Sequence, residues 1–250
     1  MCIMLVCVQT TVGDRQHDNS AKGNSTTVGN TFIVNRQLIF WWQRAAVGNG
    51  LLDNRCQLAT QRSKPLTPDF NHGSAEAQHQ IESLITGPSP RPGRIEYGIG
   101  THSVYVCDEE ILLKGSELAK RTESMLHIHA SETRKEVADC HAKHGMYPIE
   151  YLDSLDYFQD SERGGTVCAH CGWVTKKEMR ILAGHGAHAV HCPTSNQKLA
   201  CGGTMSYPAM KEAGVDVRLG TDGSASNNSL DLRAEAKAAS LVQRHDHRDA

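Results

Sequence analysis

Ionisable side chains that could hold a metal ion and move protons recur in this 250-residue chain at or just after the ends of short strand-type runs. They are His102, His129 with Glu132, His170, His191 and Asp222. His127 and His129 are two residues apart, so on a strand they would lie on the same face. Imidazole nitrogens suit Zn²⁺ or Fe²⁺, and a carboxylate such as Asp222 can bind the ion while accepting a proton from bound water. Glu132 follows His129 closely enough to shuttle a proton to a substrate atom beside that water.

Each of these residues also has an ordinary structural interpretation. The chain has 14 histidines, and a single histidine is more often a surface or hydrogen-bonded residue than a ligand. Asp222 lies between Thr221 and Gly223, which could be no more than a turn. Asn227 and Asn228 could be loop polar groups before a helix. It is the placement at successive strand ends that favours a functional interpretation.

Cys168 and Cys171 have the C-x-x-C spacing of zinc and redox sites. The other pair would have to be Cys192 and Cys201, whose spacing does not match a second zinc knuckle. The zinc deaminases that act on flipped bases combine H-x-E with P-C-x-x-C, and no H-x-E precedes this pair. The sequence therefore disfavours a structural zinc site and that class of deaminase.

Strand-type and helix-type runs alternate from about residue 94 onward. The predicted strands cover residues 95–99, 125–130, 166–169, 187–191 and 215–219. Predicted helices cover residues 109–123, 132–144, about 175–184 with Thr175 and Glu178 as a capping box, 208–213, and 229–243 with Ser229 as the cap. This order predicts a parallel sheet covered by helices, in which the strand-end loops open onto one face.

Composition narrows the class of protein. The balance of 26 Lys and Arg against 28 Asp and Glu argues against a dedicated nucleic-acid binder, which would normally be basic. No stretch approaches the roughly 20 apolar residues of a membrane span, and the apolar run 3–8 lacks the basic start of a secretion signal, so we expect a cytoplasmic protein. The first 93 residues show no clear period. We therefore divide the chain into a poorly assigned part, 1–93, and a regular part, 94–250.

Four segments together resemble the amidohydrolase superfamily. They are HIHASET at 127–133, AHCGW at 169–173, HCPTSNQKLA at 191–200 and LGTDGSASNN at 219–228. Within that superfamily they are most similar to the 5'-methylthioadenosine/S-adenosylhomocysteine deaminases and the 5'-deoxyadenosine deaminases. His102, in the segment GTHSVY, also fits the resemblance, which covers about residues 94–250.

The resemblance implies a metal-dependent hydrolytic deaminase on a (β/α)₈ TIM barrel. It makes His129, on the family's fifth strand, a metal ligand, and Glu132 the group that protonates the purine ring nitrogen beside the attacked carbon. His170 would ligate the metal or hold the attacking hydroxide. Asp222 would bind the metal and act as the base, and His102 would contact the substrate. Water would attack C6 of an adenosine analogue, ammonia would leave, and zinc, iron or manganese could serve as the ion.

The chain departs from the family where the first strand should carry a His-x-His pair that supplies two ligands. Before residue 94 only His17, His72 and His79 occur, each by itself. We therefore interpret the chain as a fragment or a divergent gene product that lacks the barrel's first strand and its C-terminal closure. Because ligand number sets most of a metal's affinity, we expect little deaminase turnover from this chain alone.

Two alternatives stay open. One is another amidohydrolase reaction on the same barrel, such as guanine or triazine-type hydrolysis. The other is a catalytically silent barrel fragment that binds a partner. The edges of an incomplete sheet must be covered, and a second copy of the chain could cover them, so a homo-oligomer is also possible.

Overall fold

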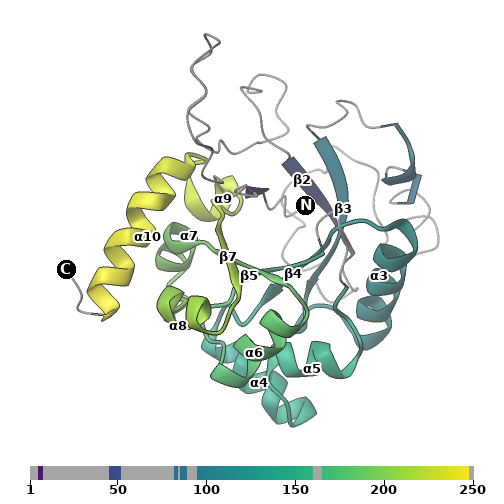
Figure 1. Cartoon of the computed structure of the whole chain (residues 1–250), viewed down its shortest axis with the longest axis horizontal. Coiled ribbons are helices and arrows are strands. Elements are labelled where there is room, and N and C mark those ends of the chain that lie inside the picture. Colours follow the sequence, from purple (N-terminus) through teal and green to yellow (C-terminus); the bar gives the residue numbers. More distant parts are fainter. Residues whose placement is uncertain are drawn as a thin grey trace, which may run out of the picture.

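The computed structural model describes residues 5–7, 45–51, 82–83, 85–88, 95–159 and 165–247. Strands and helices alternate along the C-terminal ranges, as the sequence predicts (Figure 1). The polar segment 12–30, the aromatic run 32–42 and the single histidines His17, His72 and His79 lie outside the described residues.

The strands within the described ranges are β1 (Leu5–Cys7), β2 (Ala45–Leu51), β3 (Ile95–Ser103), β4 (Leu126–Ala130), β5 (Thr166–His170), β6 (His188–His191) and β7 (Asp216–Leu219). The helices are α3 (Glu109–Thr122), α4 (Arg134–His144), α5 (Pro148–Ser154), α6 (Lys176–Gly184), α7 (Pro193–Lys198), α8 (Tyr207–Glu212), α9 (Ser224–Asn227) and α10 (Leu232–His247).

These strands form a single sheet in which they follow one another in chain order. β1 is antiparallel to β2, and every other neighbouring pair is parallel. Helices connect the successive parallel strands from β3 onward and lie around the outside of the sheet (Figure 1). The carboxyl ends of β3 to β7 therefore share one edge of the sheet, which is the edge that should carry functional groups. The predicted parallel α/β sheet is confirmed.

β2 belongs to the first 93 residues but pairs with β3 along its whole length, from Ala45 opposite Ile95 to Leu51 opposite Thr101. The described piece of the N-terminal part thus contributes to the same sheet as the C-terminal part. The division of the chain at residue 93 stays a prediction.

Alternation along the strands separates two faces of the sheet. Ile128, Cys168 and Ala189 lie side by side in the register and are buried in the main apolar core with residues of the surrounding helices. His129 and Ala169 form the adjacent row, so their side chains lie on the face away from those helices. This register directs the His129 imidazole toward the inside of the curved sheet.

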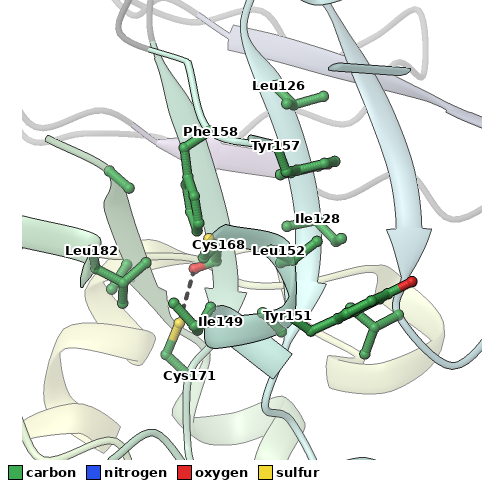
Figure 2. Packing of buried hydrophobic residues seen from close by; sticks show 14 of the residues in the cluster. Leu126, Ile128, Ile149, Tyr151, Leu152, Tyr157, Phe158, Cys168, Cys171 and Leu182 are labelled. Carbon is green, nitrogen blue, oxygen red and sulfur yellow. Dashed lines mark hydrogen bonds between the residues drawn. The ribbon is translucent and has the colours of Figure 1, made fainter. Parts of the chain in front are cut away.

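The main core fills the space between the outer face of the sheet and the helices. Figure 2 shows Ile149 and Leu152 from α5 near Ile128 and Cys168 of the sheet, all fully buried. Burying an aliphatic side chain of this size contributes about 1.5–3 kcal/mol. This core holds β4 and β5 in place, and these strands carry His129 and His170.

Polar caps define where the helices begin. The predicted capping box at α6 is confirmed, because Thr175 N donates to Glu178 Oε2 at 2.8 Å and Glu178 N donates to Thr175 Oγ1 at 3.2 Å. The predicted cap of the last helix is wrong. α10 begins at Leu232, and Asp231 Oδ1 accepts a hydrogen bond from Arg233 N at 2.9 Å, whereas Ser229 Oγ only accepts one from Asp231 N.

The sequence analysis missed the short helices α5, α7 and α9. Both α5 and α7 start with a proline, Pro148 and Pro193, which suits the first turn because proline has no N–H to leave unpaired. Helices of 7, 6 and 4 residues are too short to show a period. None of the helices in the described ranges combines the length and apolar composition needed to cross a bilayer.

Candidate active site

Three histidine rings meet at the carboxyl edge of the sheet. The His129 ring centroid lies 4.7 Å from that of His102, on β3, and 5.4 Å from that of His170, on β5, and the His129 and His170 rings are stacked. His127 is also adjacent, with its ring 5.2 Å from His129 and nearly perpendicular to it. The structure therefore brings together side chains that are up to 68 residues apart in the sequence, namely His102 and His170.

Burial favours the neutral form of the His102, His127 and His129 imidazoles. Burial and the nearby His129 and His170 charges lower the pKa of His102 to about 3. Burial, and after it the charges of neighbouring histidines, also lowers the pKa of His127 and of His129 below the ordinary value. A neutral imidazole has a lone pair on one nitrogen, which is the form that binds a metal or accepts a hydrogen bond.

His129 has a fixed tautomer. Its Nδ1 lies 2.7 Å from the carbonyl oxygen of His102, and since a carbonyl only accepts, Nδ1 donates the hydrogen bond. Nε2 is then the nitrogen with the lone pair. A second-sphere carbonyl that orients a histidine in this way is common at metal centres.

His170 leaves the regular strand conformation at its own position. Its φ is 71°, in the left-handed region, and so is that of Cys171 at 47°. Strict alternation after Ala169 would direct the His170 side chain toward the helices, and the left-handed residue breaks that alternation. Nδ1 of His170 lies 2.8 Å from Asn196 Oδ1, and Nε2 lies 3.8 Å from Glu132 Oε1. The amide oxygen accepts, so the neutral imidazole of His170 has its lone pair on Nε2.

Glu132 follows β4 and is mostly buried against the same edge. Its side chain is 12 % exposed, and Oε1 accepts a hydrogen bond from the Cys201 thiol at 3.4 Å. The carboxyl group thus has His170 on one side and Cys201 on the other. Glu132 therefore lies beside His170 at the carboxyl edge of the sheet.

Asp222 lies beyond β7 in a left-handed conformation, with φ of 59°. Its Oδ2 accepts hydrogen bonds from Ser195 Oγ and Ser226 Oγ, each at 2.6 Å, and Oδ1 accepts one from Gly223 N at 2.6 Å. Burial raises the pKa of Asp222, but the His170 charge and these three donors outweigh burial and lower it overall. Asp222 therefore stays a carboxylate, and the alternative of a plain turn does not account for its buried partners.

The sequence analysis missed Ser195, Asn196 and Ser226, which orient Asp222 and His170. All three lie inside the segments that carry the family resemblance, 191–200 and 219–228. Their place in these segments is the sequence feature that could have pointed to them. Asn227 is structural, because its Nδ2 donates to Thr221 O at 2.7 Å and to the buried Glu235 Oε1 at 2.6 Å.

Glu136 was missed as well. It is 2 % exposed and accepts hydrogen bonds from the backbone nitrogens of Ser131 at 2.9 Å and Glu132 at 2.8 Å. Burial raises its pKa to about 7, although the backbone donors act in the opposite direction. The sequence signal was its place three residues after Thr133, the spacing of a capping box.

His191 does not join the cluster, although it ends β6. It is 3 % exposed, and neither ring nitrogen has a hydrogen-bond partner among the described residues. It lines a cavity of about 260 Å³ together with Pro193, Asn196, Gln197, Thr204 and Val242. Burial, and then the His170 charge, lowers the pKa of His191 to about 4.

Cys168 and Cys171 lie buried on the core side of the sheet. Both thiols are buried, and Cys171 Sγ donates to the Cys168 carbonyl at 3.5 Å on the core side of the sheet (Figure 2). Burial raises the pKa of Cys168 to about 12 and that of Cys171 well above its ordinary value. Zinc binds thiolates, so this pair is a poor donor set.

The histidine and aspartate side chains are of the chemical types that bind a divalent metal ion. His129 and His170 present Nε2 lone pairs and Asp222 is a carboxylate, which are ligands that zinc takes in proteins. Across the described ranges, no group of three or more His, Cys, Asp or Glu side chains is arranged to hold a metal ion. The described residues thus supply part of a ligand set.

The profile of the amidohydrolase family matches residues 22–250 of the chain. A 5'-deoxyadenosine deaminase of Methanothrix thermoacetophila is 45% identical over 150 residues, which are 60% of this chain and 35% of the relative. A 5-methylthioadenosine/S-adenosylhomocysteine deaminase of Archaeoglobus fulgidus is 41% identical over 149 residues, 60% of this chain and 34% of the relative. The chain spans about a third of the length of these curated relatives.

Solved structures are similar in fold. A zinc-bound adenosine deaminase from Xanthomonas campestris has a TM-score of 0.70 and 29% identity, over 83% of this chain and 43% of that one. A guanine deaminase from C. acetobutylicum has a TM-score of 0.66 at 22% identity, over 83% of this chain and 47% of that one, and shows the fold alone. The predicted TIM-barrel-like α/β fold is confirmed.

Proposed function

The chain belongs to the amidohydrolase family, and from that membership and its site we propose that it is part of a metal-dependent hydrolytic deaminase. The substrates would be adenosine analogues such as 5'-deoxyadenosine, 5'-methylthioadenosine and S-adenosylhomocysteine. The relatives at 41–45% identity that carry deaminase names support this substrate class. The observation that carries the proposal is the meeting of Glu132, His170 and Asp222 at one edge of the sheet.

The reaction exchanges the C6 amino group of adenine for the oxygen of water. The Glu132 carboxyl group would give a proton to the ring nitrogen beside C6, so that C6 becomes open to attack. The Asp222 carboxylate would take a proton from the attacking water and pass it to the departing amino group. The C–N bond then breaks and ammonia leaves, while the proton of the C6 hydroxyl group returns to the Glu132 carboxylate, so that the inosine analogue remains and both carboxyl groups are restored.

His129 and Asp222 would hold the ion, and His170 would either ligate it or hold the attacking hydroxide. When bound, a divalent ion would supply Lewis-acid activation of the attacking water. Zinc suits this donor set, as iron and manganese also do. His102 would contact the substrate, because its neutral ring lies beside His129 at the same edge.

Turnover by this chain alone should be slow, because the described donors make only part of a ligand set. The test is a long incubation of concentrated protein and excess zinc with the three adenosine analogues, guanine and a triazine. Ammonia and the deaminated product are measured by mass spectrometry. We expect slow formation of the inosine analogues only, and Glu132→Gln should lower it by at least about 100-fold, as loss of a general acid does.

The matched control is Glu212→Gln, an exposed glutamate on α8, which should keep the wild-type rate. Conversion of guanine or the triazine in place of the adenosine analogues would replace the proposal with the other amidohydrolase reaction. No product from any compound, with no zinc bound, would favour the silent barrel fragment.

A further inference from the structure

The carboxylate of Glu136 lies directly beneath the turn that carries Glu132. Oε1 accepts the hydrogen bond from Ser131 N at 2.9 Å, and Oε2 accepts the one from Glu132 N at 2.8 Å. Both oxygens are thus used by two consecutive peptide groups, and the residue is 2 % exposed. Above pH 7, where Glu136 is mainly ionised, this charged acceptor with two backbone donors fixes both peptides more firmly than a neutral acceptor would.

This arrangement differs from the capping box at α6, which has the same sequence spacing. There Glu178 accepts the ordinary hydrogen bond from its own N-cap residue, Thr175, at 2.8 Å. At α4 the first half of the box is present, because Glu136 N donates to Thr133 Oγ1 at 3.1 Å. The Glu136 carboxylate, however, accepts hydrogen bonds from Ser131 N and Glu132 N, the two residues that precede the cap. These residues belong to the turn that carries the Glu132 side chain and not to the helix.

The turn needs an external partner because its conformation is unfavourable. Ser131 has a φ of 52°, a left-handed conformation that costs a residue with a side chain about 1 kcal/mol or more. The Ser131 carbonyl accepts a hydrogen bond from Trp173 N at 3.0 Å, which holds the other side of the same residue. With both sides held, the Glu132 side chain is directed to the edge of the sheet, 3.8 Å from His170 Nε2.

We propose that Glu136 is a positioning residue for Glu132, whose carboxylate holds the Ser131 and Glu132 peptides so that the Glu132 carboxyl group faces the substrate and His170. This role rests on the proposed function of Glu132 as the proton donor. Glu136 itself touches no reacting atom. Its effect reaches the substrate through the backbone of the turn.

The test compares Glu136→Gln with Glu178→Gln. Both wild-type residues are buried, occupy the third position of a helix and accept two backbone hydrogen bonds, which for Glu178 come from Thr175 and Ile149. In each variant the glutamine side chain puts an NH₂ group, which donates, where a carboxylate oxygen accepted from a backbone N–H. Both variants therefore lose one hydrogen bond, and we expect similar losses in the free energy of unfolding. The readouts are amide hydrogen exchange at residues 131 and 132, and the affinity for inosine, an unreactive product analogue.

We expect Glu136→Gln to speed exchange at residues 131 and 132 about tenfold or more and to weaken inosine binding about tenfold. Glu178→Gln should change neither, although its urea midpoint falls comparably. Glu136→Asp, which keeps both oxygens on a shorter stem, should recover part of the binding.

Three outcomes would overturn the inference, and they can be told apart. If the wild type binds inosine and Glu132→Gln weakens binding, but Glu136→Gln does not, only the positioning role fails. If Glu178→Gln weakens binding as much as Glu136→Gln, the effect is general destabilisation and the positioning role fails. If the wild type binds no inosine, the proposed function fails and the positioning role fails with it.

Discussion

His170 and His191 end two neighbouring parallel strands, and both are buried, yet only His170 belongs to the candidate site. His170 has a left-handed backbone, a fixed Nδ1 hydrogen bond and an Nε2 that faces Glu132. The backbone of His191 is not in the left-handed conformation, and neither of its ring nitrogens has a hydrogen-bond partner among the described residues. A strand end alone therefore does not make a site. The change of backbone direction at the last residue decides which way the side chain points.

Asn196 lies between the two histidines. Its Oδ1 accepts the hydrogen bond from His170 Nδ1 at 2.8 Å, while its Nδ2 has no partner among the described residues. The same side chain lines the cavity that His191 also lines. The contrast between the two histidines can thus be tested by changing each of them and the residue that separates them.

The largest effect is expected from His170→Ala. Of the two roles proposed for His170, metal ligation predicts that this variant lowers zinc affinity by at least about 100-fold, since losing a ligand exceeds the 10–100-fold cost of losing an outer partner. Competition with a chromophoric chelator measures the affinity. Equal losses in His170→Ala and His191→Ala would contradict the distinction between the two positions.

A smaller effect, about tenfold on zinc affinity, is expected from Asn196→Ala, because His170 then loses the partner that fixes its tautomer. The same chelator competition measures it. Gln197→Ala is the control, since this exposed neighbour on α7 has no contact with His170 in the described hydrogen bonds. If the Asn196 and Gln197 variants bind zinc equally well, the tautomer of His170 is set by something other than Asn196.

The positions of β4 to β7 could be predicted from the sequence because each is a short β-type run that ends near a polar residue. β3 continues past its predicted end at residue 99 to Ser103, so His102 lies within the strand and not after it. The edge at which His102, His129, His170 and Asp222 gather followed from the rule that parallel strands end on one face. His191 satisfied the same rule, and the sequence contained no sign that its ring would lie in a separate cavity. The left-handed φ of His170 depends on tertiary contacts, since Cys171 N donates a hydrogen bond to Ala130 O on the neighbouring strand β4.

Supporting residues were harder to predict than the groups that they orient. Thr133 and Glu136 have the spacing of a capping box, but the spacing does not say that the carboxylate reaches Ser131 and Glu132 instead of Thr133. Ser195 and Ser226 reach Asp222 from α7 and α9, and helices this short leave no periodic pattern. Such contacts link elements that are distant in sequence, so local rules do not find them.

The smallest effect on the site is expected from His191→Phe, which should change zinc affinity by less than about twofold because His191 lies outside the cluster. Its effect should appear instead in the dependence of stability on pH. The pKa of His191 is about 4 in the folded chain, against an ordinary 6.5, so above pH 6.5 both states are neutral. As the pH falls from 6.5 to 4, the unfolded chain takes up the proton first, and folding stability is lost, by about 3 kcal/mol at most.

Urea unfolding of the wild type and of His191→Phe at pH 7.5, 5.5 and 4.5 measures this loss of stability. The other buried histidines are common to both chains and cancel in the difference, so the free energy of unfolding of the variant should fall less with acid than that of the wild type. Parallel curves would mean that His191 has a partner that holds its charge, and the contrast with His170 would then lose its physical basis.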